Sequence, residues 1–209
     1  MPIPWAAGVN QTNLEKLQSC LVFADGSMRD ESCDNAHPYL CFAELSACVD
    51  ESHFQNQSLV NDIALLRLEK PLQLTEHINA LCLPTADESF EGAKNCRYAV
   101  ILKKVELDMV PHDRCQALLQ RTRLGPYFQL HRSFVCAGGD GKDTCQGDGG
   151  APLACPIGDE RYKLGGLVAW GIGCRTIDVP GVYTNVAAFR PWVDAKMRDW
   201  GFGTDAYTI

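Results

Sequence analysis

Eleven cysteines in 209 residues constrain this chain more than any other feature of its sequence. Almost none of them are spaced as a zinc-binding pair would be, so we expect disulfides rather than a metal site. This cysteine density is typical of secreted proteins, because thiols in the cytosol stay reduced. The alternative is a reduced cytosolic protein with buried thiols. Because the number is odd, at least one thiol lacks an intrachain partner.

Composition narrows the choice of partners. The chain is 46% hydrophobic and 22% charged, which is typical of one globular domain, or of one domain with a fragment of another. The net charge is −7 and no cluster of Lys and Arg forms a basic face, so nucleic acid is not an expected partner. No apolar run is long enough to span a membrane, and no motif calls for a cofactor.

The start of the chain lacks the features of a secretion signal. MPIPWAAGVNQTNLEK has neither the basic beginning nor the apolar core of a signal peptide. Because the cysteines indicate an extracellular protein, we expect that the natural N-terminus is missing from this sequence.

The residue pattern changes near positions 43–50. From Leu59 onward, short apolar runs alternate with turn residues, which is typical of an all-β fold. Apolar residues spaced by three and four predict a helix near the C-terminus, with Gly201 as its C-cap. The clearest predicted strands are 60–68, 163–171 and 181–186, and the predicted helices are 111–120 and 187–201.

Several motifs in this later part follow one another in a recognisable order. They read NDIALLRL, CQGDGGAPL, GLVAWGIGC and GVYTNV. With them, residues 48–209 resemble a trypsin-like serine protease of the chymotrypsin fold. Within that family, ILKKVELDMVPHDRCQ and QRTRLGPYFQLHRSFVCAGG resemble the clip-type, non-catalytic homologues of arthropods. Those homologues assist the prophenoloxidase, or melanisation, cascade of innate immunity.

The resemblance implies a double β-barrel followed by a C-terminal helix. It also implies a gap, because Arg97 and Tyr98 follow Cys96 where the family continues through a GWG-containing strand. Most strands of the first barrel have no counterpart before residue 48. We therefore expect an incomplete first barrel and a nearly complete second barrel over about 97–209.

The family's chemistry requires a serine nucleophile, a histidine base and a buried carboxylate. The serine position holds Gly149, which has no side chain, and Asp62 matches the carboxylate. No TAAHC-like segment supplies the base, and His53 lies too close to Asp62 for that role. The IVGG-like start whose amine would pair with Asp148 is absent as well. The resemblance thus implies no protease activity by this mechanism, and a structural role for Asp62 as an acid bonded by backbone N–H groups.

The sequence retains more of the family's binding residues than of its catalytic residues. The N–H groups of Gly147 and Gly149 match the oxyanion hole, and Asp143 matches the acidic base of a pocket for Lys or Arg. The walls of that pocket would be Ala169, Trp170, Gly171 and Gly181. Two alternatives remain open at this point: a site that binds without cutting, or an inherited pocket that is collapsed.

The N-terminal part resembles something else. Residues 4–42 resemble the C-terminal portion of a C-type lectin-like domain, so we expect a partial lectin-like fragment over 1–47 and a truncated protease-like domain over 48–209. At the family's calcium-binding positions the sequence has Val9-Asn10-Gln11 and Met28-Arg29-Asp30. Only Asp30 is a suitable ligand there, so calcium-dependent sugar binding is not expected.

Both resemblances imply disulfides. The implied pairs are Cys20–Cys33, Cys96–Cys155, Cys115–Cys136 and Cys145–Cys174. Cys41, Cys48 and Cys82 are left over, which supports a truncated chain.

The sequence therefore predicts a secreted pseudoprotease that binds protein components of a protease cascade. The alternatives are an active trypsin-like endopeptidase, a carbohydrate-binding lectin-like protein, and a chimeric gene product without a stable function.

Overall fold

The structure is a computed structural model, and the part of the chain it describes falls into two compact units. One unit comprises Met1–Cys48 and Leu65–Leu72, and the other comprises Val49–Ala64 and Gln73–Ile209. Within the described residues, no helix could cross a membrane and no group of three potential metal ligands occurs. The described residues are 19–24, 27–32, 46–49, 58–67, 80–100, 103–142, 144–145, 147–158 and 161–208.

Two short two-stranded sheets precede the main sheet. Strands β1 (Ser19–Ala24) and β2 (Ser27–Ser32) pair in antiparallel orientation. Strands β3 (Ser46–Val49) and β4 (Ala64–Arg67) pair with each other. The positions 9–11, Cys33 and Cys41 lie outside the described residues. The lectin-like fragment and the boundary at residue 48 therefore stay predictions.

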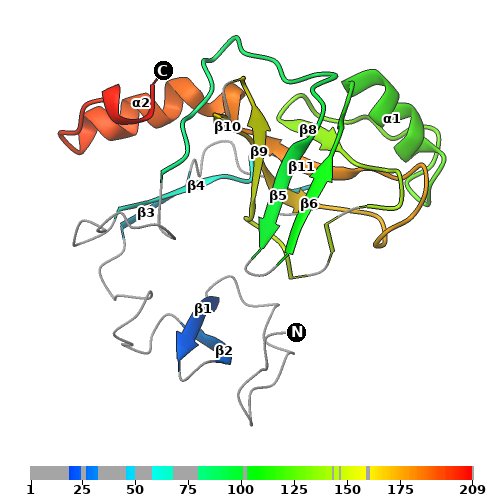
Figure 1. Ribbon diagram of the computed structural model, residues 1–209, viewed down its shortest axis with the longest axis horizontal. Helices are drawn as coiled ribbons and strands as arrows, with labels where there is room; N and C mark the ends of the chain where they lie inside the picture. Colours follow the sequence, from blue (N-terminus) through cyan, green and yellow to red (C-terminus); the bar gives the residue numbers. More distant parts are fainter. Residues whose placement is uncertain are drawn as a thin grey trace. The chain divides into compact units, whose positions relative to one another are not determined.

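The larger unit is built on one seven-stranded antiparallel sheet (Figure 1). Its strands run in the order β6-β5-β9-β10-β11-β8-β7. The segment that carries β6 and β7 pairs with β5 at one edge and with β8 at the other, so the sheet nearly closes into a barrel. The strands are β5 (Cys96–Val100), β6 (Lys103–Leu107), β7 (Met109–Val110), β8 (Phe134–Ala137), β9 (Pro152–Pro156), β10 (Tyr162–Trp170) and β11 (Gly181–Asn185).

The gap after Cys96 does not interrupt this sheet. Strand β5 begins at Cys96 itself and pairs with β6, only two residues further along the chain, and with β9. Tyr98 and Leu107 are buried in the core that these strands enclose, together with Leu153 and Tyr183. The predicted chymotrypsin-like, nearly complete second barrel is confirmed. The predicted incompleteness of the first barrel remains a prediction, because much of that region lies outside the described residues.

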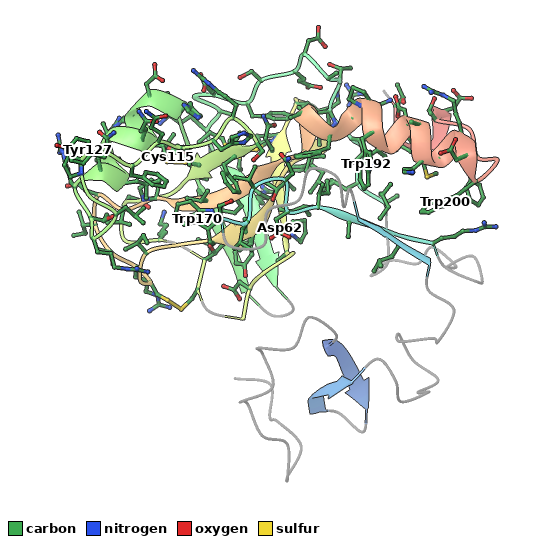
Figure 2. The ribbon with its side chains drawn as sticks, turned by 180° about the vertical axis from the view of Figure 1, so that it is seen from behind. Asp62, Cys115, Tyr127, Trp170, Trp192 and Trp200 are labelled. Atoms are coloured by element: carbon green, nitrogen blue, oxygen red, sulfur yellow. A yellow bond between two sulfur atoms is a disulfide. The ribbon has the colours of Figure 1, made fainter. Side chains whose placement is uncertain are left out.

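The two predicted helices are confirmed. Helix α1 spans His112–Gln120, and helix α2 spans Arg190–Asp199. A 3-10 turn over Val186–Phe189 precedes α2, so the α-helix begins three residues later than predicted. Gly201 has a φ of +80° just after α2, as expected of a residue that ends a helix. Figure 2 shows Cys115 on α1, Trp192 on α2 and Trp200 directly after α2.

The predicted strand over 60–68 is shorter than expected. Strand β4 starts only at Ala64, because Leu59 and Asn61 have φ angles of 53° and 61°. That left-handed conformation interrupts an extended strand, and Asn tolerates it better than most residues. The Ile63 N–H closes a turn onto the Asn61 carbonyl at 2.9 Å. The turn places Asp62 before the strand instead of in it.

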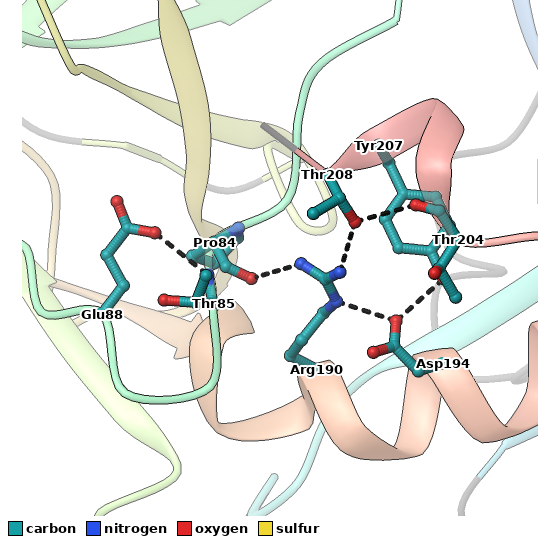
Figure 3. A network of polar contacts seen from close by, with 8 residues as sticks. All are labelled: Pro84, Thr85, Glu88, Arg190, Asp194, Thr204, Tyr207 and Thr208. Carbon is teal, nitrogen blue, oxygen red and sulfur yellow. Dashed lines mark hydrogen bonds and ion pairs between the residues drawn. The ribbon is translucent and has the colours of Figure 1, made fainter.

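Helix α2 is fastened by a buried arginine (Figure 3). Arg190 donates from Nε to Asp194 at 2.7 Å, from Nη1 to the Pro84 carbonyl at 2.9 Å and from Nη2 to Thr208. Tyr207 donates to the same Asp194 oxygen at 2.8 Å. Burial, followed by this carboxylate, raises the pKa of Tyr207 to about 12. The network ties α2 to both the segment before the sheet and the end of the chain.

Candidate functional site: a degenerate nucleophile loop

The loop around Asp148 is held firmly against the sheet. The Asp148 carboxylate accepts a hydrogen bond from the Cys145 N–H at 2.7 Å, and the Asp148 N–H donates to the Cys145 carbonyl at 3.0 Å. The Gly150 N–H donates to the carbonyl of Val168 in β10 at 2.8 Å. The disulfide Cys145–Cys174 fixes the start of the loop. Hydrogen bonds and a disulfide therefore fix the conformation of this loop.

Gly149 is exposed at the tip of this loop. Its φ is not positive, and a Cβ added there would meet no atom within 4 Å. By contrast, Gly147 and Gly150 have φ angles of +94° and +79°, which glycine adopts without strain. The position of Gly149 would therefore accept a serine side chain. Neither packing nor backbone conformation requires glycine at this position.

Among the described residues, neither the Gly147 nor the Gly149 N–H donates a hydrogen bond to a backbone carbonyl. Such groups are available to a ligand oxygen. Their role as an oxyanion-hole remnant stays a prediction.

Asp62 lies half-buried just before β4. Burial raises the pKa of its carboxyl above the ordinary value of 3.8. Thr184, which is fully buried in β11, donates from Oγ1 to the Asp62 carbonyl at 2.7 Å. The described residues supply none of the backbone N–H donors that the sequence led us to expect at its carboxylate, because Asn61 and Ile63 donate elsewhere. The structure thus anchors the backbone of Asp62 more than its side chain.

The histidines of the described residues do not complete a triad. His131 lies with Nδ1 2.9 Å from the hydroxyl of Ser133, which gives a Ser–His pair. Ser133 is only 4% exposed, so its hydroxyl is not accessible to a substrate. Both ring nitrogens of His112 are buried without a hydrogen-bond partner. The other three, His37, His53 and His77, lie outside the described residues.

The predicted pocket residues are only partly described. Asp143 lies outside the described residues, so its role as the pocket base stays a prediction. Trp170 is held edge-on by Phe128 and Phe134, with ring centroids 6.0 Å and 5.8 Å away (Figure 2). Ala169 packs against the same cluster. Trp170, which was predicted to form a wall of the pocket, thus packs against two aromatic side chains of the core.

The remaining two pocket positions differ in exposure. Gly181 is buried at the start of β11, where it pairs with Ala137, and Gly171 is exposed after β10. Their roles as pocket walls remain predictions, because the base of the pocket is not described.

Tyr98 is a site residue that the sequence analysis missed. It is 4% exposed, and its hydroxyl makes no hydrogen bond within the described residues. Burial, followed by the nearby Asp148 carboxylate, raises the pKa of the phenol. Residues two apart in a strand share a face, so a strand beginning at the disulfide-bonded Cys96 would have predicted a buried Tyr98. Its nearness to Asp148 depends on tertiary folding and has no local signal.

Three disulfides join the described residues. They are Cys96–Cys155, Cys115–Cys136 and Cys145–Cys174, the same pairs that the protease resemblance implies. Within the described residues, Cys82 has no disulfide partner. Cys33 lies outside them, so the pair Cys20–Cys33 stays a prediction, as do the partners of Cys41 and Cys48.

Comparison with known proteins shows which family this chain is similar to. A sequence model of the trypsin family matches residues 41–193. The chain is 45% identical over 172 residues to phenoloxidase-activating factor 2 of Galleria mellonella, which covers 74% of this chain and 57% of that protein.

Two mosquito proteins are also similar. Inactive CLIP domain-containing serine protease A8 of Anopheles gambiae is 41% identical over 157 residues, or 69% of this chain and 43% of that protein. Inactive CLIP domain-containing serine protease A3 of Aedes aegypti is 49% identical over 156 residues, which cover 67% of this chain and 32% of that protein. The chain thus spans between 32% and 57% of the length of these three relatives.

Proposed function

The chain belongs to the trypsin family, and we propose that it is a non-catalytic member that acts by binding proteins of an extracellular, innate-immune protease cascade. The observation that carries this proposal is Gly149, an exposed loop residue without a side chain at the family's nucleophile position. Acyl transfer begins with attack by a hydroxyl, so the family mechanism cannot start here.

The electrostatics around Asp62 support the same proposal. A triad carboxylate is kept ionised by the imidazolium that it orients. Here burial raises the pKa of Asp62, and no cation among the described residues compensates. A missing nucleophile, together with a carboxylate that has no cationic partner within the described residues, should lower catalytic activity more than either change alone, because triad members act as a unit.

The proposed setting follows from the relatives and the disulfides. Two similar proteins are named inactive serine proteases, and a third is named a phenoloxidase-activating factor. Three disulfides among the described residues favour an oxidising, extracellular compartment. We propose that the protease-like part begins near residue 48 and follows a lectin-like fragment, and that the Gly147 and Gly149 amides and the Asp143 pocket serve recognition.

A reconstituted activation assay tests the proposal. The full chain is added to purified prophenoloxidase and its activating clip-type protease, after treatment of the chain with a fluorophosphonate and removal of the reagent. We expect phenoloxidase activity to rise equally with treated and untreated chain, because no nucleophile is involved. Reduced and alkylated chain is the matched control and should have no effect. A rise that fluorophosphonate abolishes, or no rise at all, would contradict the proposed function.

A further inference from the structure

Positive charge is concentrated around α1 and the loop that follows it. Residues 111–133 contain four arginines, one aspartate and no lysine or glutamate, which gives this segment a net charge of +3 in a chain of net charge −7. The arginines are too widely spaced in the sequence to form a run. The fold places one of them on helix α1 and three on the loop that follows it. They are Arg114, Arg121, Arg123 and Arg132.

All four arginine side chains are exposed, and none has an ion-pair partner within the described residues. Several basic residues elsewhere in the unit do have one. Lys163 pairs with Glu88 at 2.8 Å, Lys94 with Asp108 at 2.7 Å, and Arg190 lies in the α2 network. Arg175 and Arg198 are also exposed without an ion-pair partner within the described residues, so what marks this segment is that it carries four such arginines.

The segment is held rigidly. The disulfide Cys115–Cys136 joins α1 to β8, and the Gln120 side chain donates to the Phe128 carbonyl at 2.8 Å. The Leu130 N–H donates to the Gln116 side chain at 3.0 Å, so the loop folds back along the helix. Binding to a rigid surface loses little conformational entropy, which favours recognition.

One aromatic side chain stands out on this loop. Tyr127 is 94% exposed, whereas its neighbour Phe128 packs against Trp170. Figure 2 shows Tyr127 at the outer margin of the unit, close to α1. Tyr and Arg are the residue types most enriched among those that dominate binding at protein interfaces. Lys, which is depleted at such interfaces, is absent from the segment.

A small cleft marks one edge of this surface. His112 and Arg132 line it together with Glu88 and Glu91. Both carboxylates already have internal partners, since Glu88 binds Lys163 and Glu91 accepts the His112 N–H at 3.1 Å. An acidic ligand would be repelled on that side, so the favourable region runs over α1 and the loop.

We propose that the arginine surface, consisting of Arg114, Arg121, Arg123 and Tyr127, docks an acidic segment of a protein partner. Guanidinium groups bind carboxylates through paired hydrogen bonds, and Tyr127 supplies the apolar contact that such a segment needs. Docking at this surface does not depend on whether the loop around Gly149 is inactive.

Fluorescence anisotropy with the full chain tests the proposal. The probe is a short fluorescein-labelled peptide of Asp and Glu interrupted by Leu, measured at low and at physiological ionic strength. We expect salt-sensitive binding that weakens about fivefold in the variant R121Q/R123Q, because two exposed charge contacts are lost. The matched control R175Q/R198Q removes the same charge from exposed arginines elsewhere and should change binding less than about twofold. Tyr127→Ala should weaken binding of the Leu-containing peptide but not of a peptide with Gln in place of Leu.

Three results would overturn the proposal. The first is equal weakening by R121Q/R123Q and R175Q/R198Q, which would mean that net charge alone attracts the peptide. The second is a heparin oligosaccharide that binds through the same arginines while the acidic peptide does not bind, which would make the surface a polysulfate site. The third is unchanged peptide binding in R121Q/R123Q. Near-ultraviolet circular dichroism of each variant checks that the fold is kept.

Discussion

The seven-stranded sheet and the nucleophile loop of this unit differ in how tightly each residue is constrained. In the sheet, a Cβ added at Gly166 would lie 2.9 Å from the Cβ of Tyr183 and 3.4 Å from the Thr184 carbonyl oxygen. At Gly149 in the loop, the same atom would meet nothing within 4 Å. The framework therefore depends on its exact residues for packing, whereas the position that defines the family's chemistry does not. Loss of a catalytic group at such a position leaves the fold intact.

The same substitution in the two regions gives the largest expected contrast. Gly166→Ala should lower the free energy of unfolding by about 2 kcal/mol, because the new methyl group overlaps Tyr183 in a packed core. Gly149→Ala should change it by less than about 0.5 kcal/mol, because the loop has room and an ordinary φ. Chemical denaturation of both variants measures the difference. Equal destabilisation would break the distinction between framework and loop.

Sequence motifs predicted the framework well because local rules set most of it. Hydrophobic periodicity located α2, and Gly201 marked its end because glycine readily adopts a positive φ. The order of motifs identified the chymotrypsin-like fold. It also predicts that Gly149 stands at the nucleophile position, which remains a prediction.

Other features depend on tertiary structure and could not be predicted from the sequence. The left-handed conformations of Leu59 and Asn61 shorten a strand that the apolar residues of 60–68 had predicted. Tyr98 lies near Asp148 only because β5 starts directly at Cys96 and enters the sheet. The proposed arginine surface has no run of basic residues to mark it, because its members are separated in sequence and lie on a helix and on the loop that a disulfide closes.

A smaller expected effect concerns the charge state of Asp62 and its contribution to stability. Burial raises the pKa of Asp62, so the folded state favours the protonated carboxyl and stability falls as the pH rises through the interval above 3.8. Asp62→Asn mimics the neutral form. It should raise the free energy of unfolding at pH 7 by less than about 1 kcal/mol, since Asp62 is only half-buried.

Thermal unfolding of wild type and Asp62→Asn at pH 7 and at pH 3 measures this effect. The gain should disappear at pH 3, where wild-type Asp62 is protonated in both states. A loss of stability at pH 7 would instead indicate a cationic partner for Asp62, and the site would then resemble a working triad more closely.

Restoring the nucleophile tests the central claim most directly. Gly149→Ser fits the loop without steric conflict, so the variant should fold like the wild type. Within the described residues its hydroxyl would still lack a base, because neither His112 nor His131 has a hydrogen bond or ion pair with Asp62. We predict that Gly149→Ser shows no turnover of an arginyl peptide amide above that of the wild type, and no fluorophosphonate labelling. Turnover in Gly149→Ser that a fluorophosphonate blocks would contradict the account, because the site would then need only its serine to become a protease.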